Sequence, residues 1–212
     1  MMEGTVLSRP NRFMVRIDHD GMPIPCHLHD PGRLKEVIFP GNRVLFRRIK
    51  GAKTDYSIAA GMNNGIWVPI DTRIHGAIAE KFLARDFTRE VTIGRKRIDY
   101  MVGGSYLEVK GCTLNMGGKA MFPDAPSRRA SEHLRLLSSI SMNGGSAYVL
   151  ILVLRADVDC FAPNAETDPE FARALIDAIQ SGVRIEAHSL SFDSKRVYYE
   201  KRLPFCGEFI SS

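Results

Sequence analysis

The sequence lacks any run of about 18 apolar residues, the length that a membrane-spanning helix requires. Residues 1–10 lack the basic and then apolar pattern of a secretory signal peptide. Internal repeats and low-complexity tracts are also missing. We therefore expect a globular protein of the cytoplasm with no membrane partner, while the oligomeric state stays open.

Cysteine is scarce and poorly placed for metal binding. The four cysteines, at positions 26, 112, 160 and 206, are widely scattered and form no CxxC pair. We therefore expect reduced thiols. His27 and His29 share one face of a predicted strand beside Cys26, but no second ligand pair stands at a suitable spacing, which excludes zinc.

Positive charge is concentrated near the start of the chain. The net charge is +5, and residues 1–65 hold ten Lys and Arg against six Asp and Glu, a local excess of +4. Arg47 and Arg48 belong to a basic run over residues 43–53 that ends at Lys53. Such a segment suits a phosphate backbone. The alternative is that these side chains are simply solvated.

The first 65 residues are predicted to be all-β. Predicted strands cover residues 13–17, 24–28, 43–48 and 56–60, with a short helical stretch at 34–37. Several short strands separated by Gly and Pro turns favour a small closed barrel of the OB type. Barrels of this kind bind single strands with a basic groove and stacking aromatic rings. We place a domain boundary at the Asn-Asn-Gly of residues 63–65, which gives domains 1–65 and 66–212.

The pattern after residue 65 is mixed α and β. Helices are expected over residues 72–85, 127–142 and 168–181, and strands near 89–95, 97–103, 105–110, 147–154 and 183–190. Residues 113–126 are expected to be irregular, and Gly117-Gly118 within them could turn a hairpin. Residues 147–154 are continuously apolar, as in a strand buried on both faces. The second domain is therefore predicted to hold a mixed sheet with helices packed against it.

Asp99 and the Glu108-Val109-Lys110 triplet carry most of the functional information. They fall on two predicted strands joined by a turn at residues 103–104. Side chains two apart in a strand share a face, so Glu108 and Lys110 project together, and the hairpin brings Asp99 beside them. Two carboxylates and an ammonium suit Mg²⁺ or Mn²⁺ and the cleavage of a phosphodiester. Gly111 follows at once, as if the backbone needed clearance. The alternative is a set of solvated side chains at strand ends.

The second half then resembles the PD-(D/E)XK nuclease superfamily, and the whole chain resembles the sugar fermentation stimulation protein A (SfsA) family. The segments that carry the resemblance are 9–13 (RPNRF), 26–34 (CHLHDPGRL), 65–68 (GIWV), 97–100 (RIDY), 107–110 (LEVK), 122–126 (FPDAP), 133–134 (HL), 161–164 (FAPN) and 168–169 (DP). The resemblance implies an OB-like barrel followed by a nuclease-like α/β domain. It also implies DNA binding and a role in regulating sugar metabolism genes.

The superfamily pattern also implies roles for particular residues. Asp99 and Glu108 would hold the metal, and Lys110 would position or activate a water. Glu80, in the helix that precedes the strands, would complete the metal shell; the alternative is a solvated glutamate on the helix surface.

Further residues are candidates for contact with nucleic acid. Ser127 is the expected N-cap of a helix whose free N–H groups can receive a phosphate. Arg129 and His133 lie four apart on one face of that helix, and Asp124 directly precedes it. The remaining candidates, all in the barrel, are Arg12, Phe13, Arg33, Arg47 and Arg48. Phe13 could instead belong to the core, and His133 could instead be a buried hydrogen-bonded histidine.

Two functions remain open from the sequence. The first is a DNA-binding protein with a metal-dependent nuclease site. The second is a non-catalytic DNA-binding regulator of sugar metabolism genes. Intact Asp, Glu and Lys residues favour the first, because a pure binder gains little from carboxylates that repel phosphate.

Overall fold

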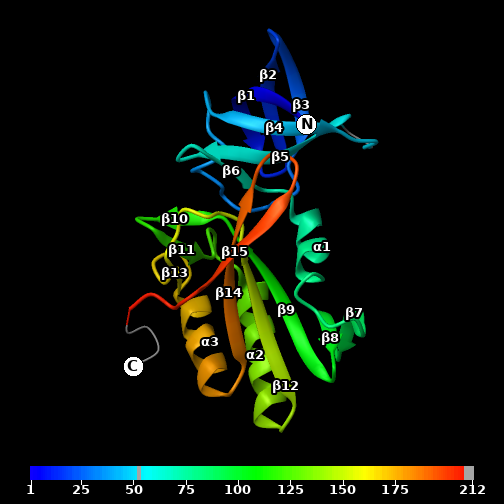
Figure 1. The fold of residues 1–212 in the computed structure, drawn as a ribbon, viewed down its shortest axis with the longest axis vertical. Helices are drawn as coiled ribbons and strands as arrows, with labels where there is room; N and C mark the ends of the chain where they lie inside the picture. The colour runs from blue at the N-terminus through cyan, green and yellow to red at the C-terminus, as the bar shows by residue number, and fades with distance from the viewer. Residues whose placement is uncertain (52–53, 208–212) are drawn as a thin grey trace.

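The computed structural model describes residues 1–51 and 54–207 and consists of two domains (Figure 1). A β-barrel is built from the N-terminal part, and an α/β domain with a central mixed sheet follows it. The predicted fold class is therefore confirmed.

The barrel domain is one antiparallel sheet closed on itself. Its strands are β1 (Met2–Asn11), β2 (Met14–His19), β3 (Met22–His27), β4 (Arg43–Arg48), β5 (Tyr56–Asn63) and β6 (Ile66–Pro69). The order is β3-β2-β1-β4-β5-β6, and a parallel pairing of His27 with Ser57 joins β3 to β5 and closes five strands into a barrel. Val15 and Ile17 are fully buried while Arg16 between them is exposed, the alternation of a strand with one face on a core.

Three details of this domain differ from the sequence prediction. β1 was not expected, since register shifts after Val6 and Ser8 break its apolar alternation. Residues 34–37 form a turn instead of a helix, because Leu34 adopts a left-handed backbone conformation, with φ of 48°. β6 pairs with β5, so the first sheet continues past the predicted boundary at residue 65.

The second domain is built around a six-stranded sheet in the order β15-β14-β12-β9-β8-β7. Its strands are β7 (Phe87–Ile93), β8 (Lys96–Val102), β9 (Ser105–Cys112), β12 (Ser146–Val153), β14 (Arg184–Phe192) and β15 (Val197–Leu203). A second sheet joins β10 (Leu114–Met116), β11 (Lys119–Phe122) and β13 (Cys160–Pro163). The helical segments are η1 (Thr72–Ile74), α1 (His75–Ala79), α2 (Arg128–Met142) and α3 (Pro169–Gln180). β9, β12 and β14 run parallel, and the other three strands of the large sheet are antiparallel to their neighbours.

The two faces of the large sheet carry separate cores. Val149 and Ile151 of β12 pack in the cluster that includes α2 and α3. Leu150 and Leu152 pack in the cluster that includes α1. β12 is therefore buried on both faces, as its continuous apolar run predicts.

The helix predicted over residues 72–85 is much shorter than expected. It consists of η1 and α1, and its last residue is Ala79. Phe82 and Leu83 still pack with Ala79 in the same core cluster, and the Phe82 ring lies 4.9 Å from that of His188. The helical spacing of these apolar residues therefore reports their burial, while the backbone leaves the helix at Glu80.

Two further predictions, a last strand at 183–190 and reduced cysteines throughout, are wrong. Residues 113–126 are more regular than expected, since β10 and β11 form a hairpin at the Gly117-Gly118 turn that the sequence allowed. β15 follows the strand that was expected to be the last. The cysteines are not all reduced, because Cys160 and Cys206 form a disulfide. Cys26 and Cys112 are free and buried. Over residues 1–51 and 54–207, no helix is long and apolar enough to cross a membrane.

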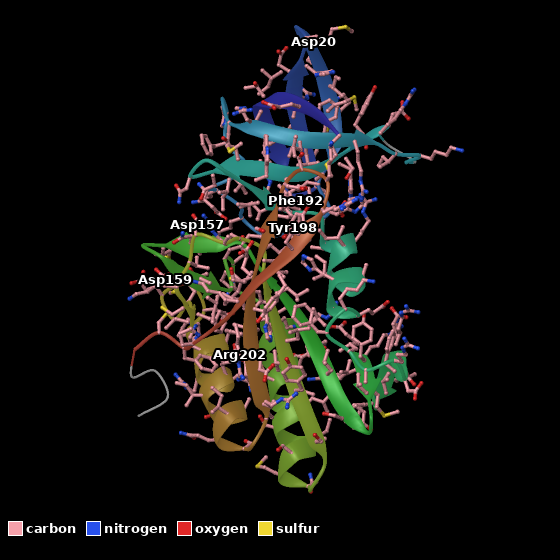
Figure 2. All side chains as sticks on the ribbon, in the orientation of Figure 1. Asp20, Asp157, Asp159, Phe192, Tyr198 and Arg202 are labelled. Atoms are coloured by element: carbon pink, nitrogen blue, oxygen red, sulfur yellow. A yellow bond between two sulfur atoms is a disulfide. The ribbon has the colours of Figure 1, made fainter. Side chains whose placement is uncertain are left out.

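The hairpin of β14 and β15 reaches from the second domain up to the barrel. Figure 2 places Phe192 and Tyr198 at this end of the hairpin and Asp20 at the opposite, far tip of the barrel. Residues of β14 contact β6 directly. The hairpin thus forms one of the contacts between the second domain and the barrel.

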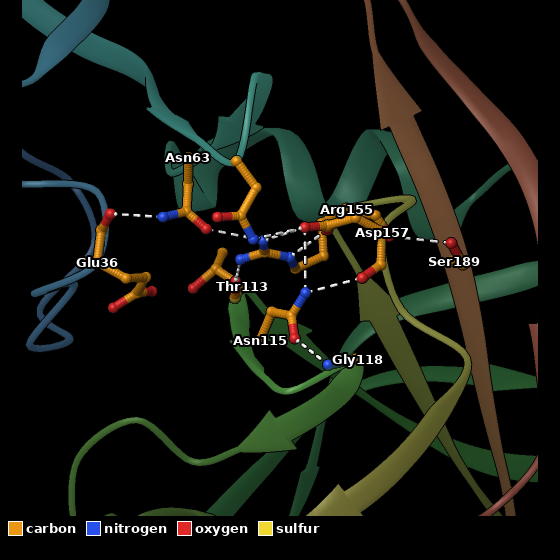
Figure 3. A network of polar contacts seen from close by, with 9 residues as sticks. Glu36, Asn63, Thr113, Asn115, Gly118, Arg155, Asp157 and Ser189 are labelled. Carbon is orange, nitrogen blue, oxygen red and sulfur yellow. Dashed lines mark hydrogen bonds and ion pairs between the residues drawn. The ribbon is translucent and has the colours of Figure 1, made fainter.

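A polar network forms a second connection between the domains (Figure 3). The fully buried Arg155 donates to both carboxylate oxygens of Asp157, at 2.7 Å each, and to Oδ1 of Asn63 at 2.8 Å. Asn63, at the end of β5, also donates to the Glu36 carbonyl at 3.0 Å. Barrel residues therefore complete the hydrogen bonding of a buried arginine that belongs to the second domain.

Candidate metal and nucleic-acid site

A cavity with a volume of about 520 Å³ lies at the domain junction. The barrel contributes Arg12 and residues 30–32 to its lining. The second domain contributes Thr72, His75, Asp99, residues 108–111, Thr113, residues 121–127, Arg129 and Ala130. The cavity therefore contains the three residues Asp99, Glu108 and Lys110 that the sequence places on neighbouring strands.

These three residues form a tight cluster on β8 and β9. Asp99 Oδ2 accepts a hydrogen bond from the backbone N–H of Val109 at 2.8 Å, which fixes the carboxylate against β9. Lys110 Nζ lies 2.5 Å from Glu108 Oε1. His133 Nδ1 approaches the same oxygen at 2.5 Å. Glu108 Oε2 is buried and has no hydrogen-bond partner.

The two carboxyl groups respond differently to this environment. Burial, together with the negative charge of Glu108, raises the pKa of Asp99. Burial alone would also raise the pKa of Glu108, but the hydrogen bond from His133 and the charge of Lys110 outweigh it and lower that pKa. Glu108 is therefore held as a carboxylate although its side chain is only 3% exposed.

His75 also lines the cavity, and the sequence prediction missed it. It is the first residue of α1, and a Cβ built at Gly111 would lie 2.2 Å from its Cε1 atom. Gly111 therefore provides the clearance that its place after Lys110 suggests. Burial lowers the pKa of His75 to about 4, so the ring is neutral. Gly111 was the only signal in the sequence, and it did not indicate which side chain approaches.

Glu80 does not belong to this cluster. Its carboxylate accepts two hydrogen bonds from Arg89, at 2.7 and 2.8 Å, and one from Tyr100 Oη at 3.1 Å. Tyr100 follows Asp99 in β8, and successive side chains of a strand point to opposite faces. Glu80 thus lies on the other side of the sheet, which corrects its predicted role in the metal shell.

The start of α2 forms one wall of the cavity. Ser127 is its N-cap and accepts a hydrogen bond from the N–H of Ala130, as predicted. Arg129 is exposed and lines the cavity. His133, one turn further along, is 4% exposed and hydrogen-bonded to Glu108. The structure therefore corrects the predicted nucleic-acid contact of His133, because the ring supports a carboxylate from within the core.

Asp124 and the loop at residues 30–34 meet across the domain junction. Asp124 Oδ2 accepts a hydrogen bond from the N–H of Leu34 at 3.0 Å. A Cβ at Gly32 would lie 2.5 Å from the same oxygen, so only glycine allows this approach. Asp124 is therefore part of the contact that joins the barrel to the cavity wall.

The candidate residues of the barrel are spread over more than one surface. Arg12 lines the cavity, and its neighbour Phe13 is 46% exposed, so Phe13 is not a core residue. Arg33 is exposed and borders a different, smaller cavity. Arg47 is not free, since its guanidinium lies 2.6 Å from Asp71. Arg48 is exposed, and Lys53 of the same basic run lies outside the described residues.

No group of three or more His, Cys, Asp and Glu side chains is arranged to hold a metal ion within the part of the chain that the structure describes.

Comparisons with known proteins cover nearly the whole chain. Residues 7–70 match the family model for the SfsA N-terminal OB domain. Residues 71–196 match the model for the sugar fermentation stimulation protein RE domain. The first match identifies the closed barrel as an OB domain, in agreement with the sequence prediction.

Curated relatives and a solved structure agree with these matches. A sugar fermentation stimulation protein homolog of Saccharolobus solfataricus is 44% identical over 206 residues, 97% of this chain and 86% of the relative. A homolog of Thermoplasma acidophilum is 44% identical over 203 residues, 96% of this chain and 91% of the relative. The structure of Pyrococcus furiosus SfsA in complex with Ca²⁺ matches with a TM-score of 0.88 and 28% identity, covering 96% of this chain and 95% of that one. The chain belongs to the sugar fermentation stimulation protein (SfsA) family.

Proposed function

We propose that this protein binds nucleic acid, DNA in the first instance, and hydrolyses its phosphodiester bonds with a divalent metal ion. The observation that carries the proposal is the pairing of Asp99 with Glu108, whose Oε2 is buried without a hydrogen-bond partner at the cavity that both residues line. A buried carboxylate oxygen without a partner is costly unless a ligand satisfies it.

The residues of the cavity fit Mg²⁺ or Mn²⁺. Hard divalent cations prefer oxygen ligands, and Mg²⁺ is commonly held by one or two carboxylates, with water and substrate phosphate as its other ligands. One carboxylate oxygen of Asp99 accepts the hydrogen bond from Val109, which leaves its other oxygen for a metal ion. Glu108 can offer Oε2, which has no hydrogen-bond partner. A relative that was solved as a Ca²⁺ complex supports an oxygen-liganded cation in this family. When bound, the ion would polarise a phosphate oxygen and activate a water.

The protein's own groups then act around the reacting phosphate. Lys110, 2.5 Å from Glu108 Oε1, offers an ammonium that can donate a hydrogen bond to a water or to the phosphoryl oxygens on which negative charge develops. Arg129 and the first turn of α2 supply positive charge and backbone N–H groups from a second direction. His133 holds Glu108 in place with a hydrogen bond to Oε1.

One observation favours the alternative, a DNA-binding regulator of sugar metabolism genes that does not cut. Lys110 and His133 both engage Glu108 Oε1, and the lysine ammonium neutralises the carboxylate where a phosphate would approach. A site with this pairing could bind a phosphate backbone without hydrolysing it.

The test is cleavage of labelled DNA and RNA with Mg²⁺, Mn²⁺ or EDTA by the wild type and by Glu108→Gln. The glutamine keeps an acceptor for Lys110 and His133 but removes the negative charge, so we expect metal-dependent products to fall by at least about 100-fold. We also expect Mn²⁺ binding, measured by calorimetry, to be lost while DNA affinity is kept or increases.

Glu80→Gln is the matched control, because it makes the same change on the other side of the sheet. It should cleave like the wild type. Binding of DNA without cleavage under every condition would reject hydrolysis in favour of the non-cutting regulator, and full activity in Glu108→Gln would show that the site is misassigned.

A further inference from the structure

The carboxylates of the site are recessed below the surface. The Glu108 side chain is 3% exposed, the neighbouring Lys110 side chain is 13% exposed, and Asp99 is half-buried. The cavity above them measures about 520 Å³, within the range of about 300–1,000 Å³ that encloses small molecules. A double helix, which keeps its bases stacked inside a wide rod, cannot enter a cavity of this size. The phosphates on the outside of that rod can approach no further than the rim of the cavity, whereas a flexible single strand can bring a phosphate down to Glu108.

The mouth of the cavity carries positive charge from both domains. Arg12 stands on the barrel side and Arg129 on the α2 side, and both are exposed. A phosphate backbone passing between the domains would meet one cation on each side. The lining also includes four acids, Asp30, Asp99, Glu108 and Asp124, so the two arginines supply the positive charge that a single chain of phosphates meets at the mouth.

Flat side chains continue from this mouth across the barrel. The guanidinium carbon of Arg12 lies 5.8 Å from the ring centroid of Phe13. The Phe13 and His27 rings are 6.3 Å apart and nearly parallel, at 10°, whereas the His29 ring, 4.3 Å from that of His27, is turned edge-on at 72°. Aromatic rings and guanidinium planes both stack on exposed bases, and every base has such a face. This column of flat side chains, formed by Arg12, Phe13 and His27, is therefore a surface for unpaired bases of any sequence.

Hydrogen bonds hold the near end of the column in place. Arg9 Nη2 donates to the carbonyls of Arg12 at 3.1 Å and Gly32 at 2.7 Å, which ties the β1–β2 turn to a loop that lines the cavity. The N–H of Phe13 donates to Asn11 Oδ1 at 2.9 Å. The stacking surface is thus formed before any ligand arrives, which reduces the entropy cost of binding.

We propose that the substrate of this site is a single-stranded nucleic acid, with its bases stacked on the Arg12–Phe13–His27 column and its backbone passing into the cavity. The inference rests on the proposed function, because it assigns a substrate class to the same cavity. DNA and RNA share the chemistry that the column and the cations recognise, namely bases and phosphates.

The experiment measures fluorescence anisotropy with one labelled oligonucleotide sequence, offered as single-stranded DNA, single-stranded RNA and blunt duplex DNA. Binding is read in EDTA and cleavage is read with Mn²⁺. We expect the wild type to bind at least one single strand about tenfold more tightly than the duplex. Phe13→Ala should weaken single-strand binding about tenfold, since a stacked base contributes about 1–3 kcal/mol and 1.4 kcal/mol is tenfold.

Phe39→Ala is the matched control. Phe39 is 45% exposed on the barrel, close to the 46% of Phe13, but it does not line the cavity. It should bind like the wild type. Phe13→Leu removes the flat ring while it keeps apolar bulk, so a similar loss in this variant assigns the effect to stacking.

The outcomes separate this inference from the proposed hydrolysis. Equal affinity for duplex and single strands, or unchanged binding in both Phe13 variants, would overturn the inference even if the protein cuts DNA. Single-strand binding that depends on Phe13 but yields no products with Mn²⁺ would support the inference and reject the hydrolysis.

Discussion

Asp30 is a half-buried acid in the lining of the cavity, and its ionisation opposes folding. Burial raises its pKa to about 6; a hydrogen bond from the Gly32 N–H opposes the rise, and the charge of Asp124 adds to it. The pKa of an aspartate in an unfolded chain is about 3.9. The folded state therefore binds the Asp30 proton more tightly than the unfolded state does. The stability that this proton contributes is present below the unfolded pKa and is lost as the pH rises through the pKa of about 6 in the folded protein.

Asp30→Asn should accordingly stabilise the protein at neutral and alkaline pH. The amide oxygen can still accept from the Gly32 N–H, and no charge has to be buried. We expect the free energy of unfolding to rise by about 1–2 kcal/mol at pH 8 and to change little at pH 4. Urea unfolding at both pH values measures this.

The control for this prediction is Asp20→Asn, which removes the same charge from the tip of the barrel where the carboxylate is 91% exposed. It should have no comparable pH dependence. An Asp30→Asn variant that is destabilised equally at pH 4 and pH 8 would contradict the assignment, because its effect would then be steric.

Strand periodicity was sufficient to bring the central residues together. Asp99, Glu108 and Lys110 line one cavity because alternation fixes the face of each side chain in β8 and β9. The positions of the Glu80 and His133 side chains depend instead on how the helical segments pack against the sheet. The local sequence does not encode that packing. Glu80 proved to face the other side of the sheet, and His133 proved to be buried.

At the scale of elements, Asp168 joins the starts of two helices. Its Oδ1 accepts from the N–H of Phe171 at 2.9 Å as the N-cap of α3. Its Oδ2 accepts from the N–H of Ser127, the N-cap of α2, at 2.8 Å. Because the start of α2 forms a wall of the cavity, this one carboxylate fixes both a helix and part of the site.

Asp168→Ala should therefore lower the free energy of unfolding by more than the loss of an ordinary N-cap does. Loss of an N-cap costs about 0.5–2 kcal/mol, and loss of the second bond adds the penalty of a donor left unpaired, so we expect about 2–3 kcal/mol in total. Urea unfolding tests this, with Asp177→Ala, an exposed position of the same helix, as the control. A loss no larger than that of the control would show that the double cap contributes nothing.

The elements that the sequence prediction missed share a physical cause. The predicted helices at α2 and α3 have an N-cap residue and an amphipathic face, which are local signals. β11 is only four residues long and is completed by a parallel pairing with β13, about forty positions later. β15 is an edge strand with mostly exposed side chains, so it has no apolar alternation to detect.

At the scale of the whole molecule, the site exists only while the two domains keep their relative placement. Arg12 belongs to the barrel, whereas Asp99 and Glu108 belong to the sheet of the second domain. The buried network of Arg155 connects these parts through Asn63 and Glu36 (Figure 3). The hydrogen bonds of this network should therefore contribute both to the free energy of unfolding and to the affinity for nucleic acid.

Arg155→Lys tests this connection while it conserves the charge. A lysine ammonium cannot reproduce the planar fork that reaches Asp157, Asn63 and the Thr113 carbonyl together. We expect a loss of about 3 kcal/mol in the free energy of unfolding, together with weaker binding of nucleic acid under conditions where the protein is fully folded. Arg135→Lys, in an exposed pair with Glu170, should cost less than about 1 kcal/mol. If Arg155→Lys loses stability but binds as well as the Arg135 variant, the network stabilises the second domain alone, and the junction is held by the β14–β15 hairpin instead.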